Sequence, residues 1–285
     1  MRLKALKKIF HEELDGQYSV NEVDTLFLRI IEHYFKITPV TLVLKPEFSL
    51  TNNEVPIVYK ALDALKKNKP VQQILGCTSF YGLDMEVNED VLIPRPETEE
   101  LVEWILSDQV HLTNKTKAIR ILDIGTGSGC IAVSLAKNFK NAEVTALDIS
   151  EKALERASRN AKMQNVNVNF INKDILGMDK LEGSYDIIVS NPPYVRLSEK
   201  ENMHANVLDY EPHLALFVPD HDALKFYKKI ATLAKNNFKE KGVLYFEINQ
   251  YLGKEVKALL QEIGFKKVML RKDISGNDRL VKAQL

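Results

Sequence analysis

The stretch Asp123-Ile-Gly-Thr-Gly-Ser-Gly-Cys130 joins an apolar run, residues 119–124, to a segment with helical spacing, residues 130–137. Glycines at such a junction let the backbone turn sharply and approach a ligand closely. The first turn of the helix also offers unpaired amide groups to that ligand. The stretch therefore predicts a strand, a ligand-binding loop and a helix, in that order.

Strands and helices continue to alternate after this unit. Further strands are expected at 142–148, 168–172, 185–190, 242–248, 266–270 and 279–283, and further helices at 151–162, 223–238 and 253–263. Such alternation predicts an α/β fold with a doubly wound, mostly parallel sheet. The last two strands are too close for a parallel return, which needs a dozen or more residues. They are therefore expected to form an antiparallel hairpin.

The residues before this domain have a different character. The first 70 show helical spacing, with capping-box patterns at Ser19 with Glu22 and at Thr51 with Glu54, and with Pro70 as a stop. Residues 78–93 have strand-like alternation and predict a β-hairpin, followed by Pro94-Arg95-Pro96 and a helix. We therefore expect a helical domain at 1–75, a hairpin and linker at 76–97, and the α/β domain at 98–285.

The composition limits the classes of function. Basic and acidic residues number 39 each, so the formal net charge is zero, whereas a protein that grips long nucleic acid usually has a basic excess. Two cysteines, Cys77 and Cys130, form neither a disulfide framework nor a zinc site, and the histidines lack metal-ligand spacing. The start of the chain does not read as a secretory signal, and no apolar run is long enough to span a membrane. The prediction is a cytoplasmic protein without a metal site.

Acidic residues follow the next two predicted strands. Asp148 ends the second strand, 19 residues after Gly129, where a carboxylate accepts hydrogen bonds from ribose hydroxyls. Asp174 follows the third strand and is a candidate to bind an adenine amino group with Ile175 against the ring; a solvated Asp174 is the alternative. The loop residues Gly125, Thr126, Gly127, Ser128 and Gly129 are spaced G-x-G-x-G rather than G-x-G-x-x-G, which disfavours a dinucleotide. The loop resembles that of class I methyltransferases, which implies S-adenosylmethionine as cofactor and S-adenosylhomocysteine as product.

A second motif, Asn191-Pro192-Pro193-Tyr194, directly follows the predicted strand at 185–190. Ligands of open α/β sheets bind beyond the carboxyl ends of the strands. The two prolines stiffen the backbone and remove two donors. The Asn191 side-chain oxygen and the Pro192 carbonyl remain as acceptors for both protons of a planar NH₂ group, and the Tyr194 ring could stack on a flat substrate. The motif therefore predicts methylation of an amide or amino nitrogen held about 3–3.5 Å from the methyl donor.

The whole chain resembles the bacterial release-factor glutamine methyltransferases, the HemK/PrmC family. The resemblance is carried by the segment from Val91 to Glu99, by the glycine loop and by Asn191 to Tyr194, with Tyr81-Gly82 and Glu211-Pro212 also fitting. One departure is Phe217-Val-Pro-Asp220, where relatives often have glycines. The resemblance implies N5-methylation of the glutamine in the Gly-Gly-Gln motif of class 1 peptide chain release factors, with the N-terminal domain helping to hold the release factor.

Three other functions remain open at this point. A DNA adenine-N6 methyltransferase could use the same four residues, but it must flip a base and hold a duplex, for which no basic excess or recognition domain is evident. A glutamine methyltransferase of a ribosomal protein shares the chemistry. A catalytically silent binding module is opposed by the intact cofactor loop and acceptors. We therefore expect release factors as partners, with neither a membrane nor a nucleic-acid substrate.

Overall fold

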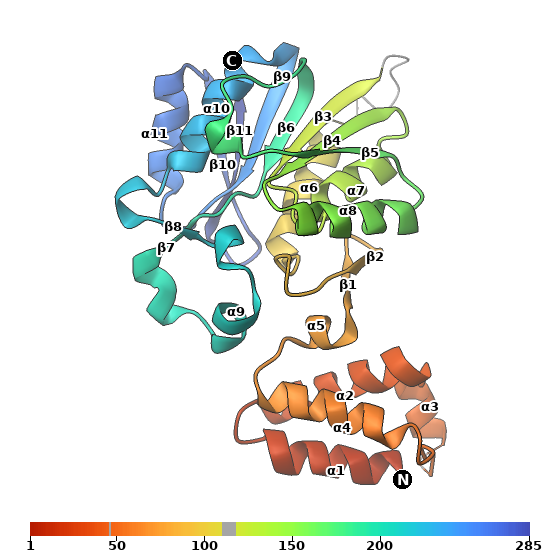
Figure 1. Cartoon of the computed structure of the whole chain (residues 1–285). Helices are drawn as coiled ribbons and strands as arrows, with labels where there is room; N and C mark the ends of the chain where they lie inside the picture. The colour runs from red at the N-terminus through yellow and green to blue at the C-terminus, as the bar shows by residue number, and fades with distance from the viewer. Residues whose placement is uncertain (46, 110–117) are drawn as a thin grey trace. The chain divides into compact units, whose positions relative to one another are not determined.

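The computed structural model describes residues 1–45, 47–109 and 118–285 (Figure 1). The chain divides into two compact units, one of residues 1–76 with 204–210 and one of residues 77–203 with 211–285. The first unit contains helices α1 (Leu3–Leu14), α2 (Val20–Phe35), α3 (Pro39–Leu44), α4 (Val55–Lys66), α5 (Val71–Leu75) and α9 (Ala205–Tyr210). It has its own apolar core, which includes the fully buried Phe10, Phe27 and Ile30. None of the helices in the described ranges is long and apolar enough to cross a membrane.

The predicted helix starts in this unit are partly right. The Ser19 hydroxyl accepts a hydrogen bond from the Glu22 amide and caps α2, as predicted. At the second pattern the Glu54 carboxylate accepts from the Thr51 amide at 2.7 Å, but α4 begins only at Val55 and ends at Lys66, before Pro70. Pro56 accounts for the later start, because proline is favoured in the first turn and has no amide to donate further along a helix.

Segment 204–210 joins the helical unit although it lies far away in the sequence. The Tyr210 hydroxyl donates to the Lys67 carbonyl at 2.7 Å, and the Gln73 side-chain amide donates to the Tyr210 carbonyl at 2.7 Å. No local sequence pattern predicts this pairing. The helical unit is therefore completed by residues that are flanked in sequence by the second unit.

The second unit is built on a seven-stranded sheet with the order β10-β11-β9-β6-β3-β4-β5. Its strands are β3 (Ile119–Ile124), β4 (Ala142–Asp148), β5 (Val168–Asn172), β6 (Tyr185–Ser190), β9 (Phe238–Glu247), β10 (Lys267–Lys272) and β11 (Asp278–Gln284). Strands β3, β4, β5, β6 and β9 pair in parallel with one another, and β11 pairs antiparallel with both β9 and β10. The predicted α/β sheet with a C-terminal antiparallel hairpin is confirmed.

Helices cover both faces of the sheet. They are α6 (Pro96–Asp108), α7 (Cys130–Asn138), α8 (Glu151–Met163), α10 (Lys225–Asn236) and α11 (Gly253–Ile263). Successive strand residues alternate between the faces: Ile121 packs in the core with α6 and α7, and Leu122 in the core with α10 and α11. Both cores are apolar, which explains why the central strands read as continuous apolar runs.

The predicted hairpin is shorter than expected. Strands β1 (Cys77–Phe80) and β2 (Leu83–Glu86) pair antiparallel, whereas residues 87–93 form no strand. Val87 and Val91 are buried against Ala153 instead, so their apolar pattern marks packing onto α8 rather than strand pairing. Phe217-Val-Pro-Asp220, the departure noted above, contributes strand β8 (Phe217–Val218), which pairs with β7 (Val195–Arg196).

Candidate active site

The carboxyl ends of four parallel strands bring the predicted site residues together. Ile124 pairs with Leu147 of β4 and with Ser190 of β6, and Asp148 pairs with Asn172 of β5. The loops after β3, β4, β5 and β6 therefore start at one edge of the sheet. A β-carbon on Gly125 would lie 4.0 Å from the Asn191 carbonyl oxygen, so the glycine loop and the second motif are in contact.

The glycine loop depends on its glycines at two positions in particular. Gly127 has a φ of +55°, and its amide donates to Asp148 Oδ2 at 2.9 Å. Gly129 has a φ of +80°, and a β-carbon there would lie 2.8 Å from that of Ala157. Left-handed backbone favours glycine, and the close approach of α8 excludes any side chain at Gly129. The loop therefore cannot keep this shape with other residues at these places.

Asp148 and Asp174 both reach the site, but in different ways. The two oxygens of Asp148 accept from the amides of Gly127 and Ser150, each at 2.9 Å. Burial raises the pKa of Asp148, and these amide donors oppose the rise. Asp174 is exposed, and its carboxylate accepts from the Leu176 amide at 2.9 Å in the 3₁₀ turn Ile175–Gly177. Each carboxylate retains lone pairs for a ligand.

These residues line one cavity of about 270 Å³, just below the roughly 300–1,000 Å³ usual for small-molecule sites. The loop residues Gly125 to Ser128, Asp148, Asp174, Ile175, Asn191, Pro192 and Pro193 all border it, whereas Gly129 does not. Apolar side chains such as Leu147, Ile149 and Ile175 provide flat walls between the carboxylates. Carboxylates beside apolar walls suit a nucleoside, whose ribose is polar and whose base is flat.

Tyr194 lies differently from the sequence-based expectation of a stacking ring. It does not line the cavity; its ring packs against the core under α10, and its hydroxyl donates to Glu247 Oε1 at 3.0 Å. Burial raises the pKa of Tyr194 well above its usual range, so the phenol stays protonated. A role for Tyr194 in gripping the substrate remains a prediction, and the contact seen here supports the loop from below.

Two buried residues next to the Asn191 side chain were not identified from the sequence, and one of them, Thr98, also borders the cavity. The Asn191 side-chain amide donates to Thr98 Oγ1 at 3.3 Å, and the Thr98 hydroxyl donates to Glu247 Oε2 at 2.6 Å. Thr98 is in the segment that carried the family resemblance, but it had no assigned role. Glu247 interrupts the apolar strand Val243-Leu-Tyr-Phe-Glu-Ile248. A charged residue in a buried strand was the signal that could have indicated it.

A second acid–base contact fixes the segment before α6. Glu211, which is 4% exposed, accepts from the Ile93 amide at 3.0 Å and from the Arg95 guanidinium at 2.5 Å. Pro94 and Pro212, the neighbours of Arg95 and Glu211, both line the cavity. The ion pair therefore holds two separate segments of the cavity wall together.

Asp123 starts the glycine loop and is completely buried. One of its oxygens accepts from the Thr126 hydroxyl at 2.6 Å and from the Ala132 amide at 3.2 Å, while the other has no partner among the described residues. Burial raises the pKa of Asp123 to about 7. Because folding raises this pKa, the folded protein holds the proton more tightly than the unfolded chain does. The contribution of Asp123 to the free energy of unfolding is therefore complete below about pH 4 and is lost as the pH rises to about 7.

Asp123→Asn should therefore stabilise the protein at high pH, because it replaces a buried charge with a neutral group of the same shape. From pH 5 to pH 8 the difference in unfolding free energy should move in favour of the variant by at least about 1 kcal/mol, since one pKa unit corresponds to about 1.4 kcal/mol. Urea unfolding of both proteins at the two pH values measures this difference. An equal difference at both pH values would show that Asp123 does not titrate in this range.

The surroundings exclude some other chemistries for this cavity. Cys130 borders it, but burial raises the pKa of its thiol to about 12, so it is no nucleophile at neutral pH. No group of three or more metal-ligating side chains occurs in the described ranges; His111 lies outside them.

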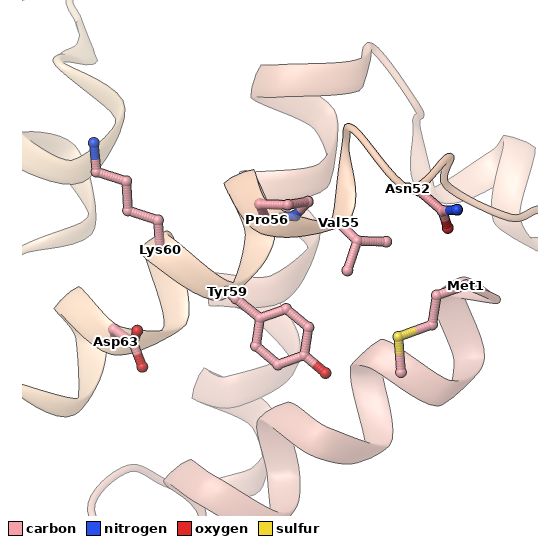
Figure 2. Close-up of a pocket in the computed structure, with 7 residues that line it drawn as sticks. All are labelled: Met1, Asn52, Val55, Pro56, Tyr59, Lys60 and Asp63. Atoms are coloured by element: carbon pink, nitrogen blue, oxygen red, sulfur yellow. The ribbon is translucent and has the colours of Figure 1, made fainter.

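A second hollow, on the helical unit, is bordered by Met1, Val55 and Tyr59, with Lys60 and Asp63 at its edge (Figure 2). It contains none of the predicted site residues.

A sheet of this topology, with a glycine loop after β3, an acid at the end of β4 and an Asn-Pro-Pro-Tyr motif after β6, defines a class I methyltransferase. The family model described as "Methyltransferase small domain" matches residues 107–210. The hMettl16 catalytic domain in complex with a 3′UTR hairpin has the same fold, with a TM-score of 0.56 at 18% identity over 75% of this chain and 80% of that one. The human methyltransferase 10 domain containing protein gives a TM-score of 0.53 at 19% identity, over 74% and 94% of the two chains.

Relatives with higher identity define the family within this class. The release factor glutamine methyltransferase of Flavobacterium psychrophilum is 51% identical over 282 residues, 99% of each chain. The protein of the same name from Streptococcus pneumoniae is 41% identical and covers 99% of this chain and 98% of its own. The chain belongs to the family of release factor glutamine methyltransferases.

The cofactor of this methyltransferase is S-adenosylmethionine. The residues present fit it: Asp148 has free lone pairs for ribose hydroxyls, the Gly125 to Ser128 backbone borders the cavity, and Ile175 offers an apolar surface beside Asp174. The binding role of each residue is nevertheless a prediction, and Asp148 is tested below.

Proposed function

We propose that this protein transfers a methyl group from S-adenosylmethionine to the side-chain nitrogen, N5, of the glutamine in the Gly-Gly-Gln motif of class 1 peptide chain release factors. One observation carries the proposal: Asn191 borders the same cavity as the glycine loop, with its amide NH₂ tied to Thr98. This leaves its oxygen as an acceptor for a substrate NH₂ group. The names of the relatives supply the macromolecule that carries such a group.

The chain's own residues can provide what this reaction requires. An amide nitrogen is a poor nucleophile because its lone pair is delocalised into the carbonyl. The Asn191 oxygen and the Pro192 carbonyl would accept both N–H groups, which raises electron density on nitrogen and fixes its direction of attack. When bound, S-adenosylmethionine supplies an electrophilic methyl group on a positively charged sulfur. Attack by the nitrogen held at Asn191 and Pro192 would form the nitrogen–carbon bond as the carbon–sulfur bond breaks, and the amide proton would then leave to water.

No residue in the site needs to remove a proton before the attack. The Tyr194 phenol is held neutral by burial and donates to Glu247 rather than accepting from a substrate. Prolines 192 and 193 keep the acceptors in place, and the Asn249 side chain donates to the Tyr194 carbonyl at 3.0 Å to hold the end of the loop. The contribution of the protein is therefore the orientation of the substrate amide.

Mass spectrometry tests the proposal directly. Purified release factor is incubated with the protein and S-adenosylmethionine, and the peptide containing Gly-Gly-Gln is sequenced for one added methyl on glutamine. Parallel reactions with ribosomal proteins and with duplex DNA test the two rival substrates. Methyl transfer to adenine or to a ribosomal protein, with none to the release factor, would overturn the proposal. The compartment we propose for the reaction is the cytoplasm, where release factors act.

We further propose that the helical unit, residues 1–75 in the sequence-based division, docks the release factor. Its helix α3 presents Val40, Val43 and Leu44, which are 66%, 80% and 75% exposed. Exposed apolar residues grouped in this way are typical of protein interaction sites. Segment 204–210 packs within this unit, so deletion of residues 1–75 would also expose part of the remaining chain. Substitution on the surface is the cleaner test.

Val43→Glu should lower kcat/KM for intact release factor by about tenfold, because it places a charge in an apolar contact. It should leave kcat/KM for a short Gly-Gly-Gln peptide unchanged, since the peptide is too small to reach a separate docking surface. Ile274→Glu, at a position 92% exposed in the other unit, is the matched control. Equal activity of the Val43 variant and this control on intact release factor would remove α3 from the docking surface.

A further inference from the structure

A chain of buried hydrogen bonds runs from Asn191 into the core. Thr98, in the first turn of α6, accepts from the Asn191 amide at 3.3 Å and donates to Glu247 at 2.6 Å. Glu247, at the end of β9, also accepts from Tyr194 at 3.0 Å. Thr98 is 2% exposed and Glu247 is 1% exposed. An acid this deeply buried is costly to the fold unless it is hydrogen-bonded, and here two hydroxyl groups donate to it.

The direction of each of these hydrogen bonds follows from counting the protons that are available to donate. A carboxylate only accepts, so both hydroxyls that meet Glu247 must donate to it. Thr98 has a single hydroxyl proton, and donation to Glu247 uses it. Towards Asn191 the threonine oxygen can then only accept. Asn191 must therefore turn its NH₂ towards Thr98 and its Oδ1 away from it.

We propose that Glu247 and Thr98 are positioning residues that set the orientation of the Asn191 amide, so that Oδ1 rather than NH₂ faces the substrate nitrogen. The inference rests on the proposed function, in which Asn191 accepts a proton from the glutamine amide. Asparagine oxygen and nitrogen have nearly the same shape, so steric packing alone does not choose between the two orientations. A flipped Asn191 would present donors to a group that itself needs acceptors.

Several neighbours of Glu247 oppose the protonation that burial favours. Burial raises the pKa of Glu247 and the charge of Glu97 adds to the rise, while the hydroxyl donors Thr98 and Tyr194 and the positive charge of Arg279 oppose it. Arg279 is itself held by Asp273 at 3.2 Å, so it does not pair directly with Glu247. Measurements at pH 8 lie well above the usual range of a carboxyl group, and the proton count above applies there.

Kinetics of three variants separate positioning from simple structural support. Thr98→Val removes the acceptor for Asn191 and should lower kcat/KM for a Gly-Gly-Gln peptide by about tenfold; Thr98→Ser restores the hydroxyl and should recover most of the loss. Glu247→Gln offers an NH₂ to Thr98, which frees the threonine proton to donate to Asn191 Oδ1 and so favours the flipped amide. It should lower kcat/KM at least about fivefold, with S-adenosylmethionine affinity changed less than twofold.

The decisive comparison is made in an Asn191→Ala background. If Thr98 and Glu247 act through the Asn191 amide, Thr98→Val and Glu247→Gln should cause no further loss there. A purely structural role would reduce activity by the same factor in both backgrounds and would overturn the inference. Tyr227→Phe is the matched control, because its buried hydroxyl donates to the Glu247 backbone carbonyl, at 3.4 Å, and not to the Glu247 carboxylate. It should leave kcat/KM unchanged.

A measurement without any substrate keeps this inference separate from the proposed function. The Asn191 side-chain NH₂ resonances can be assigned in a ¹⁵N–¹H spectrum by their loss in Asn191→Ala. They should be protected from solvent exchange in the wild type, and shifted with faster exchange in Thr98→Val and Glu247→Gln. Unchanged resonances in both variants would overturn the orientation argument. Absence of methylation of any release factor by the wild type would overturn the proposed function while leaving this result standing.

Discussion

Asn191→Ala should lower turnover on the Gly-Gly-Gln peptide by at least about 10²-fold. The change removes one of two acceptors and leaves a substrate N–H unpaired in a desolvated pocket, which costs roughly 1–3 kcal/mol in binding. Misorientation adds to this cost, because small displacements near the reacting atom can reduce the rate by about 10²-fold. Affinity for S-adenosylmethionine should change much less, since the glycine loop and Asp148 are untouched.

The structure alters what Asn191→Asp is expected to do. From the sequence, aspartate retains an acceptor of nearly the same shape and should keep more activity than alanine. In the structure, however, the asparagine NH₂ faces Thr98, whose proton is already donated to Glu247. An aspartate would place a second carboxylate against the same hydroxyl, so the two acids compete for one proton. We therefore expect the Asn191→Asp variant to be more active than Asn191→Ala by only a small factor.

Single-turnover rates with the peptide, and calorimetry with the cofactor, measure these two effects separately. A wild-type methylation rate for Asn191→Ala would show that this side chain is not part of the reaction. A parallel loss of cofactor affinity would instead place Asn191 mainly in the cofactor site. Circular dichroism of each variant confirms that the fold is retained.

Much of the sheet was predictable because its strands have clear boundaries. Strands 142–148, 168–172 and 185–190 and helix 253–263 have the bounds expected from the sequence. In each case an apolar or amphipathic pattern ends at residues that favour turns, such as Asp148-Ile-Ser150 or Gly264. Local pattern and global fold agree at these places, so the local pattern suffices.

Elements that depend on distant contacts were harder to predict. Strand β9 begins at Phe238 rather than Gly242, although Lys239-Glu240-Lys241 looks like a turn, because Phe238 pairs with Tyr185 of β6. Residues 87–93 alternate like a strand but bury their valines on α8. Helix α9 belongs to a unit formed mostly by the first 76 residues. Nothing local to any of these segments specifies its partner.

The candidate site also contains some residues that the sequence predicts and others that depend on distant contacts. The glycine loop, Asp148 and Asn191 were predictable because each directly follows a buried parallel strand, and such strand ends meet at one edge. Thr98 and Glu247 are separated from each other by 149 positions, and their hydrogen bond depends on α6 packing against β9. The sequence can identify the residues that face the substrate but does not identify those that orient them.

Asp148→Ala should weaken S-adenosylmethionine binding at least tenfold. In the proposed role the carboxylate accepts from two ribose hydroxyls, and each charge-assisted bond contributes about 1.5–3 kcal/mol at most. The structure adds a second cause: the same carboxylate accepts from the Gly127 and Ser150 amides at 2.9 Å, so its loss also releases the glycine loop. The fold itself should survive, because Asp148 does not belong to the apolar core on either face of the sheet.

Asp148→Asn separates these two causes. The asparagine oxygen can still accept from one loop amide, but its NH₂ group cannot accept from the other or from a ribose hydroxyl. Titration calorimetry with S-adenosylmethionine and with its product should show weakening by both variants, with alanine the weaker binder. Since S-adenosylmethionine and its product have the same ribose, each variant should lower the affinity for the two ligands by the same factor. Unchanged affinity in Asp148→Ala would remove the ribose assignment, and a loss confined to S-adenosylmethionine would place Asp148 near the sulfonium charge instead.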